Sequence, residues 1–68
     1  MIRKKVGNRI RELRQAQNIS QEKLALKADI DRTYLASVEQ GKRNIAIVNL
    51  EKIVMALDTT LEVFFKGL

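Results

Sequence analysis

The polar and charged residues of this chain that could do chemistry are concentrated between Ser20 and Asn44, and their spacing suits a helix that lies in a groove of DNA. Ser20 and Asp31 each precede an apolar segment with helical periodicity. Each side chain can therefore accept a hydrogen bond from a free backbone N–H and start a helix. Gly41 follows the last apolar position, Val38, and can adopt the left-handed conformation that ends a helix. The segment thus predicts two short helices with a tight turn between them.

These two helices are predicted over residues 21–28 and 32–40. Because only Asp29 and Ile30 separate the first helix from the Asp31 cap of the second, the two helices must meet at a steep angle, as in a helix-turn-helix. Ala25 stands where the helices of such a motif cross, and a larger side chain would push them apart. Asp29 occupies a turn position where many such motifs have Gly, and Asp tolerates a positive φ better than most residues. The inward-facing positions are Leu24, Ala25, Ala28, Leu35 and Val38, with Ile30 as the apolar plug of the turn.

Positive charge is distributed unevenly along the sequence. The formal net charge is +5, and residues 1–14 account for all of it, because the bases there are opposed only by Glu12. Lys42 and Arg43 form a second basic point. A basic cluster is the footprint of a protein that binds a polyanion, although such charges can also be a solvated helix face. Together with a helix-turn-helix, the charge favours DNA. The bases of the N-terminal segment are Arg3, Lys4, Lys5, Arg9, Arg11 and Arg14.

Composition excludes several other classes of function. The chain has 68 residues, which is the size of one domain, and we expect a single domain over 1–68. It has no Cys and no His, so zinc fingers, disulfide frameworks and catalysis by either residue are excluded. Without a nucleophile–base pair or a Gly-rich loop, we expect neither an enzyme nor a small-molecule ligand, cofactor or metal. No apolar run approaches the ~20 residues that span a bilayer, and no signal peptide is visible, so we expect a cytoplasmic protein without a membrane partner.

The periodicity along the whole chain predicts an all-α domain of five helices. The three helices outside the helix-turn-helix are predicted from Ile2 or Val6 to Gln17, over Ile47–Leu57, and over Leu61–Phe65. Thr60 can cap the last of them, and Gly41 to Asn44 form a polar bend. The inward-facing positions of the first and fourth helices are Val6, Ile10, Leu13, Leu50, Ile53, Val54 and Leu57.

Three motifs together carry a resemblance to a known family. They are Arg9-Ile10-Arg11-Glu12-Leu13-Arg14, Ser20-Gln21-Glu22 with Leu24-Ala25, and Glu39 with Gly41-Lys42-Arg43. The chain resembles, over nearly its whole length, the Cro and phage-repressor family of helix-turn-helix domains. The segment Asp31-Arg32-Thr33-Tyr34-Leu35, followed by Arg43-Asn44, looks closer still to the controller proteins of restriction–modification systems, which are small dimeric regulators.

The resemblance implies that the helix over residues 32–40 enters the major groove with its first residues at the base edges. The base contacts are then expected from Arg32, Thr33 and Ser37. Arg32 suits a bidentate bond to guanine, and Thr33 can offer a hydroxyl or a methyl contact to thymine. The alternative is that Arg32 and Thr33 are only polar first-turn residues, but an unpaired Arg there opposes the helix dipole. Tyr34 is expected among the phosphate contacts through its hydroxyl, and the alternatives are packing of its ring on the rim of the motif and stacking at a base step.

The family likewise implies phosphate contacts on both sides of this helix. Gln21 would donate to a phosphate beside the free N–H groups that start its helix. The opposite contacts would come from Lys42, Arg43 and Asn44, which set register and affinity but read no sequence directly. Arg14 and Glu39 match a family ion pair between the first and third helices, the alternative being two independent surface charges.

The C-terminal segment has more apolar surface than so small a domain can bury. Leu61 and one of Phe64 and Phe65 are expected to complete the core, and the remainder would form a symmetric homodimer patch. The candidates for this patch are Ile45, Ile47, Leu61, Phe64 and Phe65. The alternative is that all of them belong to the core. Family behaviour and palindromic operators both favour a homodimer.

We therefore expect a sequence-specific DNA-binding transcriptional regulator, and the resemblance implies the role of a restriction–modification controller protein. The alternative is the antitoxin of a toxin–antitoxin pair that autoregulates its operon. Antitoxins of this type normally add a segment that binds the toxin, and no residue after Leu68 is left for that purpose unless the dimer patch also serves it.

Overall fold

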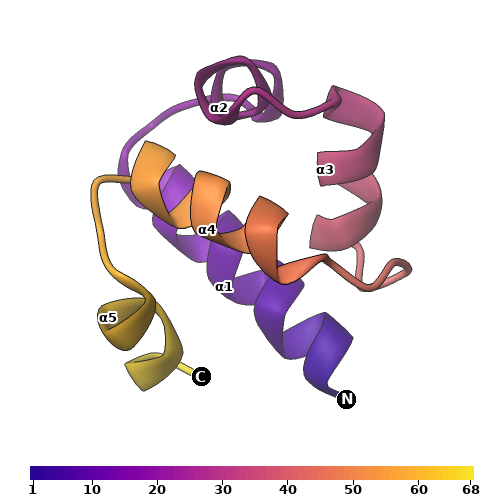
Figure 1. Cartoon of the computed structure of the whole chain (residues 1–68), viewed down its shortest axis with the longest axis vertical. Helices are drawn as coiled ribbons and strands as arrows, with labels where there is room; N and C mark the ends of the chain where they lie inside the picture. Colours follow the sequence, from indigo (N-terminus) through magenta and orange to yellow (C-terminus); the bar gives the residue numbers. More distant parts are fainter.

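The computed structural model describes all residues, 1–68, and contains five helices and no strands, as predicted. Figure 1 shows α1 and α4 crossing at the centre of the molecule, with α2 and α3 on one side and α5 on the other. None of the helices has the length and apolar character needed to cross a membrane. The helices are α1 (Ile2–Ala16), α2 (Gln21–Ala28), α3 (Arg32–Glu39), α4 (Ile47–Ala56) and α5 (Leu61–Lys66).

Three of these helices begin at the polar residues that the sequence marks as caps. The Ser20 hydroxyl accepts a hydrogen bond from the Lys23 N–H at 3.0 Å, and the Asp31 carboxylate accepts one from the Tyr34 N–H at 3.1 Å. Thr60 caps α5 in the same way, since its hydroxyl accepts a hydrogen bond from the Val63 N–H. Each bond satisfies a backbone donor that has no partner within the helix, so these starts are determined locally.

The stops of α2 and α3 also follow the local sequence. Asp29 has φ 58° and Gly41 has φ 75°, which places both residues in the left-handed region that ends a helix. The predicted ends differ from the observed ones by one residue, since α1, α3 and α4 each stop one residue early and α5 extends one further. The first helix begins at Ile2, the earlier of the two predicted starts.

One apolar core holds the five helices together. Every position predicted to face inward in α1 to α4 is buried, apart from Leu13 and Ile30, which are partly buried against the core. Ala25 is 2 % exposed, which agrees with the expected close packing of α2 at this position. The fully buried large apolar side chains are Ile10, Leu24, Leu35, Ile53, Leu57 and Phe64.

Phe64 corrects one of the predicted dimer residues. Its ring is 0 % exposed, so it fills the core and is absent from the surface of the folded chain, whereas Phe65 is 43 % exposed. The two rings meet edge to face, with centroids 5.3 Å apart. The sequence left open which of the two would be buried, because adjacent residues of a short helix point in different directions and only the position of α5 decides between them.

Candidate nucleic-acid interface

α3 presents one polar face to solvent and buries the opposite one. Leu35 and Val38 lie in the core, and this fixes the rotation of the helix about its own axis. Arg32 and Thr33 are consequently exposed at its start, and Ser37 is half-buried one turn later. No acidic side chain lies within ion-pair distance of the Arg32 guanidinium. The donors of Arg32 are therefore available to a partner outside the chain.

Tyr34 connects α3 to the start of α4. Its hydroxyl oxygen accepts hydrogen bonds from the Ala46 N–H and from the Asn49 amide, both at 3.2 Å, and its half-buried ring packs against the core. The ring of Tyr34 thus packs on the rim of the motif, and the hydroxyl hydrogen, which these two bonds do not use, is left for the expected phosphate contact. Asn49 was not singled out by the sequence, because a polar residue on a helix gives no sign of a partner fifteen residues away.

The loop between α3 and α4 carries Lys42, Arg43 and Asn44, and all three side chains are exposed. The Arg43 guanidinium carbon lies 5.0 Å from the centre of the Tyr34 ring, within the range of a cation–π contact. This contact holds the positive charge of Arg43 beside α3. The three residues predicted to contact phosphates thus lie on one exposed loop, next to the exposed polar face of α3.

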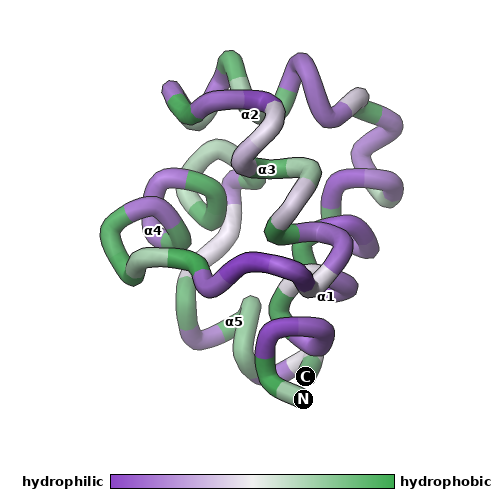
Figure 2. Tube along the Cα trace, turned by 90° about the vertical axis from the view of Figure 1, so that its right-hand side faces the viewer, coloured by the Kyte–Doolittle hydropathy of each residue, from purple (hydrophilic) through white to green (hydrophobic).

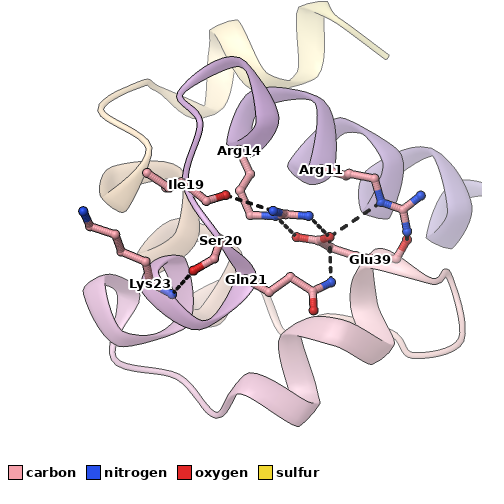
Figure 3. A network of polar contacts seen from close by, with 7 residues as sticks. All are labelled: Arg11, Arg14, Ile19, Ser20, Gln21, Lys23 and Glu39. Atoms are coloured by element: carbon pink, nitrogen blue, oxygen red, sulfur yellow. Dashed lines mark hydrogen bonds and ion pairs between the residues drawn. The ribbon is translucent and has the colours of Figure 1, made fainter.

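Glu39 is the buried centre of a polar network that joins three helices (Figure 3). Its carboxylate is 0 % exposed and accepts two hydrogen bonds from Arg14, at 2.8 and 3.0 Å, in a bidentate pair. Arg11 donates to the backbone carbonyl of Glu39 at 3.2 Å. Arg14 also donates to the Ile19 carbonyl at 2.9 Å, in the connection before α2. The structure thus brings the predicted pair of Arg14 and Glu39 together and adds two further anchors to it.

Gln21 belongs to the same network. Its side-chain amide donates to the Glu39 carboxylate at 3.0 Å (Figure 3). One of the two amide hydrogens is therefore used within the fold, and the other, with the start of α2, remains for an external phosphate. Because Gln21 begins α2 and Glu39 ends α3, this bond also ties the two helices of the motif to each other.

The basic cluster of residues 1–14 divides into two groups, which corrects its interpretation as one surface. Arg11 and Arg14 are used in the Glu39 network. Arg9 donates to the backbone carbonyls of Phe64 at 2.9 Å and Val63 at 3.0 Å, and so satisfies the C-terminal end of α5. Only the bases of the first turn remain fully exposed. The resemblance predicted the internal role of Arg14, but the sequence did not show those of Arg9 and Arg11, whose partners lie far along the chain.

α4 and α5 leave several large apolar side chains in solvent. Of the residues predicted for the dimer, Ile47 and Phe65 are exposed, while Ile45 and Leu61 are only partly buried against the core. Figure 2 shows hydrophobic residues along much of α4 and α5. A helix that is apolar on most of its circumference normally has partners on more than one side, and this signal was present in the sequence of α4. The exposed apolar residues of the two helices are Ile47, Val48, Met55, Val63 and Phe65.

Comparison with known proteins places this architecture among characterised relatives. The control protein C.MunI of Mycoplasma sp is 44 % identical over 68 residues, which cover 98 % of this chain and 92 % of the relative. The crystal structure of the restriction–modification controller protein C.AhdI from Aeromonas hydrophila superposes with a TM-score of 0.89 at 44 % identity, covering 93 % of this chain and 96 % of that one.

The structure of a second controller protein is known in complex with DNA. The C.Esp1396I tetramer, in complex with its natural 35 base-pair operator, matches with a TM-score of 0.92 at 36 % identity, covering 97 % of this chain and 87 % of that one. The sequence profile of the helix-turn-helix family matches residues 10–64, a range that contains all of α2, α3 and α4. This chain therefore belongs to the helix-turn-helix family, and its relatives there are restriction–modification controller proteins.

Proposed function

We propose that this protein is a sequence-specific DNA-binding transcriptional regulator of the controller type, which acts in the cytoplasm as a homodimer on a palindromic operator. The observation that carries the proposal is the free polar face of α3, where Arg32 and Thr33 stand exposed and without an internal partner. The similarity to C.MunI over 98 % of the chain supports the controller role over that of an antitoxin.

In the proposed complex, α3 lies in the major groove with its first turn at the base edges. Arg32 donates two hydrogen bonds to a guanine, Thr33 contacts a thymine, and Ser37 reaches a base one turn further on. Gln21, Lys42, Arg43 and Asn44 bond phosphates on either side and so set the position of α3 along the groove. The Glu39 network contributes by fixing the angle between α3 and the rest of the domain.

The homodimer would pair the exposed apolar side chains of α4 and α5 across a two-fold axis. Ile47 and Phe65 are 65 % and 43 % exposed, an arrangement that a partner surface would stabilise. Two copies would then present their α3 helices about 34 Å apart, one turn of DNA. Selection of binding sites from a pool of random duplexes tests the whole proposal, because a palindromic consensus is expected and the absence of any consensus would refute it.

Arg32→Ala is expected to weaken binding to the selected operator by ~1–3 kcal/mol and to relax the preference at one position of each half-site. The reason is that the bidentate bond to guanine is lost while the phosphate contacts remain. Titrations over single-base operator variants measure this, with Lys23→Ala on α2 as a control that removes the same charge. An unchanged preference profile in Arg32→Ala would show that Arg32 does not read bases.

Arg43→Ala is expected to lower affinity for all sequences about equally. Loss of one phosphate contact should reduce the slope of log affinity against log salt concentration by ~0.9 for each subunit. Titrations at several salt concentrations measure the slope, and Lys27→Ala on the exposed face of α2 is the charge-matched control. A lost base preference with an unchanged slope would mean that Arg43 reads bases instead.

A further inference from the structure

Five exposed bases of this protein lie in two segments of the chain that contain no acid. The chain has 13 bases and 8 acids. Neither segment 1–11 nor segment 40–50 contains an acid, and every acid lies outside them. These five are Arg3, Lys4, Lys5, Lys42 and Arg43, and all are exposed.

The two acid-free segments meet in space where α1 begins and α3 ends. A Cβ atom on Gly41 would lie 2.6 Å from the Lys4 Cγ and 3.1 Å from its Cα, so the loop backbone touches α1 directly. Gly7 packs even more closely against the backbone carbonyls of Val38 and Glu39. Arg3 and Lys4 precede Gly7 by four and three residues, which places them on the side of α1 that faces α3. Figure 1 shows the start of α1 and the loop after α3 at the same corner of the molecule.

The charges at the start of α1 are not explained by the stability of the fold. Arg3, Lys4 and Lys5 occupy the first turn of α1, where no acid is present and where positive charge opposes the helix dipole. α1 has no side-chain cap that would offset this. No ion pair includes Arg3, Lys4, Lys42 or Arg43. The arrangement therefore destabilises the start of α1 in the free protein and is favourable only opposite an external anion.

We infer that Arg3, Lys4, Lys42 and Arg43 form a continuous basic ridge that binds the DNA backbone beyond the base pairs that α3 reads. The inference rests on the proposed function and extends it to α1 and to DNA outside the half-site. The ridge begins beside α3, where Arg43 stacks on Tyr34, and it continues across Gly41 to the first turn of α1. Lys5 lies on a neighbouring side of α1, next to Gly67, and is not part of the ridge.

The test compares two double variants that remove the same charge. Arg3→Gln with Lys4→Gln alters the ridge, and Lys5→Gln with Lys27→Gln alters exposed bases of α1 and α2 that lie outside the ridge and outside the proposed dimer interface. Relative to the wild type, the ridge variant should bind the operator more weakly, with an unchanged base preference and a salt slope lower by about 0.9 for each lost contact. When the salt concentration rises from 50 to 200 mM, the ratio of wild-type affinity to ridge-variant affinity should then fall about 3- to 4-fold for each lost contact. The control variant should keep the wild-type slope.

Two further measurements separate DNA binding from a structural role. The unfolding temperature of the ridge variant should stay equal or rise, because a charge that opposes the dipole of α1 is removed. On duplexes that carry the same operator with short or long flanks, the wild type and the control should gain affinity from the longer flanks, and the ridge variant should not.

The possible failures are distinguishable. A wild type that selects no sequence would refute the proposed function. A wild type that binds its operator selectively, with a ridge variant that matches the control in affinity, slope and dependence on the flanks, would overturn the ridge alone. Wild-type binding to vesicles of anionic phospholipid that the ridge variant loses, with operator binding unaffected, would also overturn it.

Discussion

Glu39→Ala is expected to lower the free energy of unfolding by about 3–5 kcal/mol. The substitution leaves Arg14, which is 12 % exposed, without its bidentate partner, and it also removes the acceptor of the Gln21 amide. Total stabilities of domains are only about 5–15 kcal/mol, and a chain of this size lies near the lower limit, so much of the variant should be unfolded at 37 °C. Urea denaturation followed by circular dichroism measures the change.

Two variants show whether the buried charge of Glu39 accounts for this loss of stability. Glu51→Ala removes an exposed acid of α4 that forms no ion pair, and it should change stability by less than about 0.5 kcal/mol. Glu39→Leu combined with Arg14→Met removes both charges and should recover most of the loss, since a buried ion pair is often replaced by apolar residues at little cost. Equal stabilities of Glu39→Ala and Glu51→Ala would contradict a structural role for the network.

Phe65→Glu is expected to give a folded monomer that binds a full operator far more weakly than the wild type. Phe65 is 43 % exposed, and a carboxylate at this position would be buried without a partner in a two-fold interface of α4 and α5. One half-site supplies only half of the contacts, so the affinity that comes from two linked recognition helices is lost. Sedimentation at micromolar concentration gives the oligomeric state, and titration of the operator gives the affinity.

Leu26→Glu is the matched control for this variant. Leu26 is 82 % exposed but lies on α2, away from the proposed interface, so the change should leave the oligomeric state unaltered. A monomeric wild type that binds its operator tightly would refute the dimer. A Phe65→Glu protein that still sediments as a dimer would show that the interface lies elsewhere on the domain.

The local elements of this fold were predictable because their causes lie within a few residues. The caps at Ser20, Asp31 and Thr60 each act on an N–H three residues away, and the left-handed stops at Asp29 and Gly41 depend on the residue itself. Helical periodicity then identified the core positions of α1 to α4, because burial repeats with the turn of the helix. The same signals predict which residues of α3 face outward.

The roles of the charged and aromatic residues, by contrast, were decided by tertiary packing. Arg9 donates to carbonyls of α5 that lie more than fifty residues away in the sequence. Arg11 and Arg14 form ion pairs with Glu39. Arg3 and Lys4, on the same helix, remain exposed. Nothing in the periodicity of α1 distinguishes these bases. Whether a basic side chain forms an internal bond or stays free for an external partner depends on which acceptors lie opposite it in three dimensions. Only the packing of the helices brings those acceptors close. Likewise, the position of α5 against the core, and no property of the sequence nearby, buries Phe64 and exposes Phe65.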